Sequence, residues 1–192
     1  MAEAALKHIS IEEYLVAERA ATEKHEYYKG EIFAMSGASI PHNRIQANII
    51  REVGLALKGK SCDVFGSDLR IHIPSNSLFT YPDAVIVCGE LETLDDAFDT
   101  ILNPTAIFEI LSPSTQSYDR GDKFNLYRAI PSLKEYVLIA SETVGVEKYT
   151  RQENGQWLLQ EWKETSDTIV LESISYSLPL VEIYAGIRDY KP

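Results

Sequence analysis

Three side chains have types and positions that could support metal-dependent hydrolysis. Asp83 begins an apolar stretch, and Glu109 lies inside the apolar run Thr105–Leu111. A carboxylate in such a setting is costly unless it is paired, binds a metal or reaches solvent. Two carboxylates and a backbone carbonyl, here that of Ile110, would suit Mg²⁺ or Mn²⁺, because hard ions prefer oxygen ligands. Lys123 follows in a helical segment, and its ammonium could neutralise charge on a phosphodiester.

Each of these residues also has a purely structural interpretation. Asp83 could be a solvated strand end, Glu109 an internal ion pair or a protonated acid, and Lys123 a stem packed on the core with its amine in water. We favour function for Glu109, because buried ionisable groups concentrate at working sites. Lys123, Tyr127 and Ile130 lie at i, i+4 and i+7, so this helix face could carry Lys123 over the sheet end where Glu109 emerges.

Two further residues are weaker candidates for lining the site. His42 lies at the start of a predicted long helix, where it could contact a metal or a phosphate, or act as a cap or a surface residue. Asp119 lies in the first turn of its helix, where an acid is favoured by the helix dipole. It could also pair with Lys123 at i, i+4.

The elements that must position these residues alternate between helices and strands. The capping-box pattern Ser10–Glu13 predicts the first helix, and Lys29–Gly30 predicts a hairpin turn. This order predicts an α/β fold with a mixed central β-sheet flanked by helices and extra β-hairpins at both ends, in one domain over residues 1–192 with its core at about 38–142. The expected helices are 11–19, 41–57 and 117–129, with a short one from 179; the expected strands are 62–65, 69–73, 82–88, 105–111, 135–140, 144–150, 157–162 and 168–171, with a hairpin over 26–35 and a loop over 89–103.

Composition limits the class of function. The formal net charge of −11 counts against tight non-specific DNA binding, which depends on Lys and Arg contacts to phosphates. No apolar run is long enough to span a bilayer, and Met1–His8 lacks the pattern of a signal peptide. Cys62 and Cys88 are expected to be buried, unpaired thiols. These features favour a cytoplasmic protein without a membrane segment.

Several segments together resemble the Uma2 family, a bacterial group that is expanded in cyanobacteria. The resemblance extends from about Ser10 to Tyr184 and implies a restriction-endonuclease-like fold of the PD-(D/E)XK superfamily. It also implies an Mg²⁺- or Mn²⁺-dependent endonuclease acting on nucleic acid, DNA rather than RNA, with Asp83 and Glu109 as metal ligands and Lys123 assisting the attacking water. The segments that carry it are Tyr81–Val85, Phe108–Thr115, Asp119–Lys123, Tyr127 and Glu135–Tyr136, with Glu31–Ile32, Ser36–Gly37 and His42 upstream.

One departure from the superfamily pattern leaves a rival function open. The position two residues after Glu109, where the superfamily has lysine, is Leu111. The resemblance implies that the lysine has moved to the following helix, as Lys123. The rival is a binding or assembly module that kept the fold and lost the chemistry; a glycosidase using the two acids ranks last, because it leaves Lys123 without a role. Aromatic residues in the terminal strands favour a homodimer, although Trp157 and Trp162 could equally be core.

Overall fold

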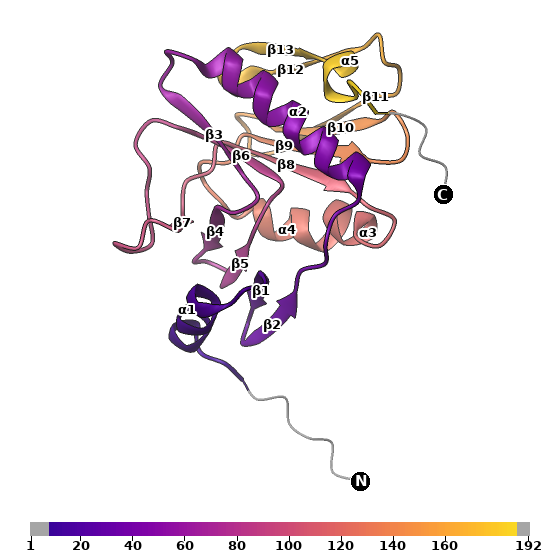
Figure 1. The fold of residues 1–192 in the computed structure, drawn as a ribbon. Coiled ribbons are helices and arrows are strands. Elements are labelled where there is room, and N and C mark those ends of the chain that lie inside the picture. Colours follow the sequence, from indigo (N-terminus) through magenta and orange to yellow (C-terminus); the bar gives the residue numbers. More distant parts are fainter. Residues whose placement is uncertain (1–7, 188–192) are drawn as a thin grey trace.

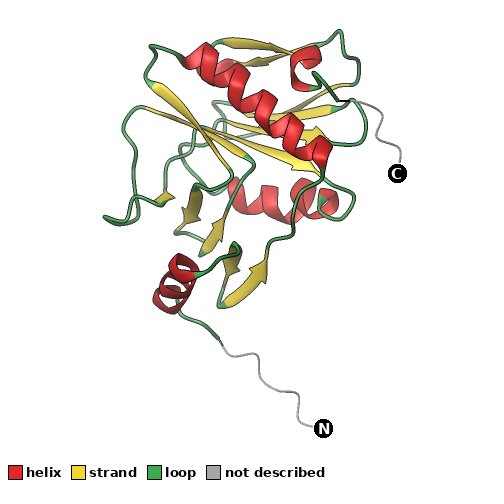
Figure 2. Ribbon diagram, viewed as in Figure 1, coloured by secondary structure: helices red, strands yellow, loops and turns green. Residues whose placement is uncertain are grey.

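A computed structural model describes residues 8–187, which form two main sheets and a small terminal hairpin (Figures 1 and 2). No helix within this range is long and apolar enough to cross a membrane. The sequence analysis found no signal-peptide pattern in Met1–His8. Most of that segment, Met1–Lys7, lies outside the described residues. The helices are α1 (Ile11–Ala20), α2 (Ile40–Leu57), α3 (Gln116–Tyr118), α4 (Phe124–Tyr127) and α5 (Leu180–Ile183); the strands are β1 (His25–Tyr28), β2 (Glu31–Ala34), β3 (Cys62–Gly66), β4 (Arg70–Ile73), β5 (Leu78–Thr80), β6 (Ala84–Cys88), β7 (Thr100–Ile101), β8 (Ala106–Leu111), β9 (Glu135–Ala140), β10 (Val146–Arg151), β11 (Trp157–Trp162), β12 (Thr168–Leu171) and β13 (Tyr176–Pro179).

The larger sheet has the order β11-β10-β9-β8-β6-β3 and is covered on both faces (Figure 1). Only β8 and β9 pair in parallel; the other neighbours are antiparallel. Alternation along β8 sends Phe108 and Ile110 into the core beneath α2 and the β12–β13 hairpin. Ile107 and Leu111 enter the opposite core, which contains the helical segment 116–127. Glu109 shares the face of Ile107 and Leu111, as the sequence predicted.

The smaller sheet, of order β2-β1-β5-β4-β7, carries the N-terminal hairpin. The predicted turn is confirmed, since Lys29 and Gly30 both have positive φ, as a two-residue hairpin turn of type I′ requires. The capping box of α1 is also present. Tyr14 of α1 packs on Tyr27 and Phe79, and these rings join the helix to the sheet.

The predicted helix 117–129 is interrupted at the residues that matter most. Helices α3 and α4 are joined by a π-helical turn, η1 (Asp119–Lys123). A π-turn inserts an extra residue, so it turns the side chains that precede it relative to those that follow, and such turns are frequent at functional sites. Asp119 and Lys123 are both buried within it. The prediction of an uninterrupted helix was therefore wrong at the point where the site is built.

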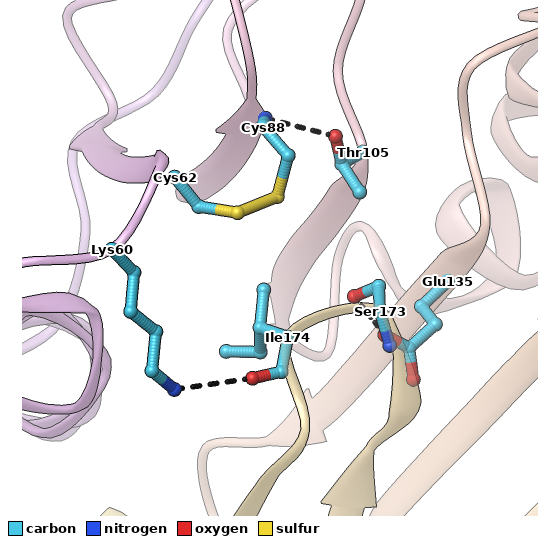
Figure 3. The surroundings of a disulfide bond; sticks show 7 residues. All are labelled: Lys60, Cys62, Cys88, Thr105, Glu135, Ser173 and Ile174. Atoms are coloured by element: carbon cyan, nitrogen blue, oxygen red, sulfur yellow. Dashed lines mark hydrogen bonds between the residues drawn. A yellow bond between two sulfur atoms is a disulfide. The ribbon is translucent and has the colours of Figure 1, made fainter.

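The two cysteines form a disulfide, so the prediction of unpaired thiols was wrong (Figure 3). Cys62 of β3 and Cys88 of β6 are directly opposite in an antiparallel pair, with a Cα–Cα distance of 4.0 Å. The two cysteines are 26 residues apart in the sequence, and nothing in that spacing indicates a bond. They meet only because of the register in which β3 pairs with β6. Beside them, the amide of Cys88 donates a hydrogen bond to Oγ1 of Thr105 at 3.1 Å.

Glu135 anchors the C-terminal hairpin and lies outside the carboxylate cluster around Lys123. It is fully buried and accepts hydrogen bonds from the amides of Glu172 and Ser173 at 3.0 and 3.1 Å. Lys148 neutralises it at 3.3 Å. Part of the pattern that resembles Uma2 therefore serves the fold, by holding β12 and β13 against the sheet.

Candidate active site

Lys123 and Glu109 form the buried centre of the site. Nζ of Lys123 lies 2.9 Å from Oε1 of Glu109, and both side chains are 6% exposed. The same Oε1 accepts a hydrogen bond from the hydroxyl of Tyr127 at 2.7 Å. The helix thus brings Lys123 and Tyr127 onto one carboxylate oxygen of β8, which confirms the contact expected from the i, i+4 spacing.

Asp83 reaches the same sheet end from the strand beside β8. Its Oδ2 accepts the amide of Ile110 at 2.7 Å and lies 3.2 Å from Nε2 of His42. Its carbonyl accepts a hydrogen bond from Gln46 of α2 at 2.8 Å. The backbone pairing of β6 with β8 starts at Ala84, one residue after Asp83. At Asp83 the side chain takes over, since it accepts the amide of Ile110 in β8.

Two more acids surround Lys123. Oδ1 of Asp119 lies 3.8 Å from Nζ, across the π-turn. Oε1 of Glu26, from β1, lies 3.3 Å from Nζ and also accepts a short hydrogen bond from Thr80 of β5. An ammonium carries three N–H donors. Lys123 therefore has three carboxylates within 4 Å of its ammonium.

The site opens at two of its acids. The side chains of Asp83 and Glu26 are 17% and 14% exposed, whereas Asp119 is as buried as the central pair. Glu109, Lys123 and Asp119 are thus the deeply buried members of the cluster, and Asp83 and Glu26 are its more exposed members.

Burial controls the charges of the central pair. Loss of solvent raises the pKa of Glu109 to about 8; Lys123 opposes this shift, and the charges of Asp119 and Asp83 add to it. Burial disfavours the charged form of Lys123, yet Glu109, Glu26 and Asp119 together hold the pKa of Lys123 well above its usual value. Burial also raises the pKa of Asp119. The surrounding acids thus favour the charged form of Lys123, whereas burial favours the protonated form of Glu109.

The donor set at the sheet end fits a hard cation with few protein ligands. Within residues 8–187, no group of three or more His, Cys, Asp or Glu side chains is disposed to hold a metal. Oδ1 of Asp83 and Oε2 of Glu109, however, make no hydrogen bond with the described residues. The N–H and C=O of one strand residue point to the same edge, so the carbonyl of Ile110 is directed toward the edge where its amide meets Asp83. Two carboxylate oxygens and a carbonyl are the kind of partial set that Mg²⁺ completes with water.

All five predicted side chains converge at this place. Asp83, Glu109 and Lys123 are joined by His42 and Asp119 through the contacts above. Sequence reasoning missed one acid, Glu26, because its contact with Lys123 joins residues 97 positions apart through the pairing of β1 with β5. The available signal was an acid directly before two tyrosines in a short strand.

Arg70 lies apart from this cluster. Its guanidinium is buried, lies over the rings of Tyr14 and Tyr81 and pairs with Asp99 at 3.0 Å. It serves the packing of α1 against the smaller sheet.

Comparison with known sequences places the chain in a family. The chain belongs to the Uma2 family, described as "Putative restriction endonuclease", whose profile matches residues 11–180. Two proteins of Synechocystis sp. strain PCC 6803 are similar over most of their length. "Uncharacterized protein slr1290" is 37% identical over 93% of this chain and 93% of its own, and "Uncharacterized protein sll1609" is 38% identical over 84% and 91%.

Comparison with solved structures supports the predicted fold class. A crystal structure from Anabaena variabilis ATCC 29413, described as "a putative nuclease belonging to DUF820", superposes with a TM-score of 0.75. The match covers 92% of this chain and 98% of that chain at 18% identity, which is evidence for the fold. The mixed α/β architecture with a restriction-endonuclease-like core, expected from the sequence, is confirmed.

Proposed function

We propose that this protein is a metal-dependent endonuclease of the PD-(D/E)XK type that hydrolyses phosphodiester bonds in DNA. The observation that carries the proposal is the convergence of Asp83, Glu109 and Lys123 at one end of the larger sheet. The names given to the family and to its structural relative support the same class of reaction.

The chain's own groups have distinct roles in this proposal. Asp83 and Glu109, with the carbonyl of Ile110, would hold Mg²⁺ or Mn²⁺ at the end of the larger sheet. When bound, the ion supplies Lewis-acid stabilisation of the phosphodiester and lowers the pKa of a water. Lys123 contributes a fixed positive charge beside the reacting phosphate, where it stabilises developing negative charge. His42 orients Asp83 through their 3.2 Å contact.

A cleavage assay tests the proposal directly. Plasmid and oligonucleotide DNA are incubated with Mg²⁺ or Mn²⁺ and either the unmodified chain or Asp83→Asn, which keeps an acceptor for the amide of Ile110. We expect the variant to lose at least about 100-fold in rate, since a ligand charge is removed. Asp96→Asn, in the exposed loop before β7, is the matched control and should cleave normally. Equal cleavage by the Asp83 variant would refute the assignment.

The second candidate is a module that keeps the fold without chemistry. The observation that favours it is the cation already present: Lys123 occupies the midst of three carboxylates. Calorimetric titration with Mn²⁺ separates the two candidates. Binding that is weakened in Glu109→Gln supports the nuclease. No binding up to millimolar Mn²⁺, with no difference between the two proteins, supports the module.

Three expectations from the sequence stay predictions. These are DNA rather than RNA as substrate, a cytoplasmic location and a homodimer. Trp157 packs edge-on against Phe124 in the core, and Trp162 packs against the opposite core. The aromatic residues of β11 thus have partners within the chain, and the expected dimer needs a measurement of mass in solution.

A further inference from the structure

Strand β11 forms an open edge of the larger sheet. It pairs with β10 on one side and, among the described residues, has no strand on the other. The amide of Gln152 donates to the carbonyl of Gln156 at 2.7 Å, so residues 152 and 156 form a hydrogen-bonded pair at the start of the β10–β11 ladder. Such pairs alternate along an antiparallel ladder, so the backbone groups of residues 158, 160 and 162 face β10. Those of Trp157, Leu159 and Glu161 therefore face outward.

The outward side of β11 is available for pairing. Within residues 8–187, the N–H and C=O groups of Trp157, Leu159 and Glu161 make no hydrogen bond. The middle of the strand is exposed as well, with Leu158 at 49% and Leu159 at 44%. Alternation puts these two leucines on opposite faces of the sheet. A strand with free backbone groups and exposed apolar side chains is a template for the addition of another strand.

The other edges of the two main sheets are short or carry charge. β3 contains the exposed Asp63, β2 begins with the exposed Glu31, and β7 has only two residues. Edge strands of these kinds resist pairing with another chain. β11 has six residues without proline or lysine, and its one charged residue, Glu161, is next to its end. Of these edges, β11 is therefore the one suited to a contact between molecules.

A second copy of the chain provides a matching edge. Two β11 strands related by a two-fold axis perpendicular to the sheet run antiparallel and keep each sheet face on the same side. Outward-facing residues then pair with outward-facing residues, which allows Leu159 to lie opposite Leu159 of the second copy. In this register Trp157 is opposite Glu161, and Leu158 is opposite Gln160. No like charges are opposed, and the two exposed leucines meet uncharged neighbours.

We propose that β11 pairs antiparallel with β11 of a second copy, centred on Leu159, so that the six-stranded sheets of the two copies join. The backbone groups of Trp157, Leu159 and Glu161 bond across this seam. Only one strand of each copy takes part, and interfaces this small belong to weak, reversible complexes. The dimer therefore dissociates on dilution. β8, which carries Glu109, is separated from β11 by β9 and β10, so the dimer does not depend on the proposed chemistry.

Two charge variants test the seam in solution. Sedimentation velocity of the full-length chain, from micromolar to millimolar concentration, should show an equilibrium between monomer and dimer. Leu159→Lys and Leu159→Asp should each raise the dissociation constant at least about tenfold, because each places like charges directly opposite one another. An equimolar mixture of the two variants should recover the dimer, since the lysine then lies opposite the aspartate.

Val16 provides the matched control. It is 74% exposed on α1, and Val16→Lys and Val16→Asp should leave the dissociation constant unchanged. A chain that stays monomeric over the whole range would overturn the proposal. So would a dimer that neither Leu159 variant weakens, or a mixture of the two variants that dimerises no better than each alone.

Amide hydrogen exchange tests the direction of the backbone groups. The amides of Trp157, Leu159 and Glu161 should exchange more slowly as the concentration rises, because the second copy covers them. The amides of Leu158 and residues 160 and 162 already bond to β10 and should change less. Rates at the three outward amides that are independent of concentration would overturn the proposal. If these amides are protected even in the dilute monomer, another segment of the same chain covers the edge, and the proposal is wrong.

Discussion

The ammonium of Lys123 lies 2.9 Å from the carboxylate of Glu109, although the two residues are 14 positions apart and come from different elements. The pattern considered in the sequence analysis has a lysine at the position of residue 111, on the same strand and face as Glu109. Leu111 is buried there in the core that includes Phe124 and Tyr127. The π-turn that carries Lys123 supplies the charge from the helix that covers this core. The positive charge beside Glu109 thus comes from the adjoining helical layer and not from the strand itself.

Replacing Lys123 should abolish cleavage while preserving metal binding. Lys123→Met keeps the length of the buried stem and removes the positive charge beside the reacting phosphate, so we expect a loss of at least about 100-fold in kcat. Single-turnover cleavage measures it, with circular dichroism to confirm folding. Lys134→Met, an exposed lysine before β9, is the control. If Lys123→Met cleaves at the normal rate, the lysine is structural.

Whether a lysine at position 123 replaces one at position 111 can be tested by moving the lysine back to the strand. Leu111 shares the face of Glu109, so a lysine placed there points toward the same carboxylate. We expect Leu111→Lys combined with Lys123→Met to recover part of the activity that Lys123→Met loses. Recovery of at least about tenfold in single-turnover rate would support the exchange, and a double variant as inactive as Lys123→Met would argue against it, provided that thermal unfolding shows both to be folded.

The buried acid Glu109 should make the metal-free protein less stable as pH rises. Its pKa is about 8 when folded and near the ordinary 4.5 when unfolded. Below pH 4.5 the group is protonated in both states and has no effect. Between pH 4.5 and 8 the unfolded state has lost the proton and the folded state keeps it, so stability falls by up to about 1.4 kcal/mol per pH unit. Urea unfolding in EDTA at pH 5 to 8 should show this decline, and Glu109→Gln should lessen it. Parallel curves for the two proteins would contradict the shift.

Much of the fold could be predicted because local signals and global packing agree. Ser10 and Glu13 cap α1, Ser39 caps α2, and the alternation along β8 assigns its two faces. The short strands β5 and β7 were missed, since three and two residues are too few to show alternation. They exist because β4 pairs with both of them, a contact that local sequence does not contain.

The part of the site that the sequence revealed is the one where a charged residue interrupts an apolar strand. The remaining part depends on tertiary contacts, which the local sequence does not contain. Glu109 was evident because a carboxylate interrupts an apolar strand. Glu26 lies in a short strand with no such contrast, and its role depends on β1 pairing with β5. The disulfide was missed for the same reason, since only the register of β3 against β6 makes Cys62 and Cys88 neighbours.

The disulfide should stabilise the fold without being needed for chemistry. It closes a loop of 26 residues, for which chain entropy gives a stabilisation of about 3.5 kcal/mol. Cys62→Ser combined with Cys88→Ser should lower the free energy of unfolding by roughly that amount, and reductant should have the same effect on the unmodified chain. Denaturation with and without reductant measures both. A reductant effect that persists in the double variant would show that it does not come from this bond.

Glu26 should be coupled energetically to Lys123, so the N-terminal hairpin and the nuclease core should behave as one unit at the site. Their atoms are 3.3 Å apart, and both side chains are largely buried, which limits solvent screening. Glu26→Gln keeps an acceptor for Thr80 and removes the charge. In a double-mutant cycle with Lys123→Met, read from free energies of unfolding, we expect an interaction of at least about 1 kcal/mol. Glu31→Gln on the same hairpin face, where the acid is exposed, should give a value near zero with Lys123→Met. Equal coupling for the two glutamates would mean that the contact between Glu26 and Lys123 carries no specific energy.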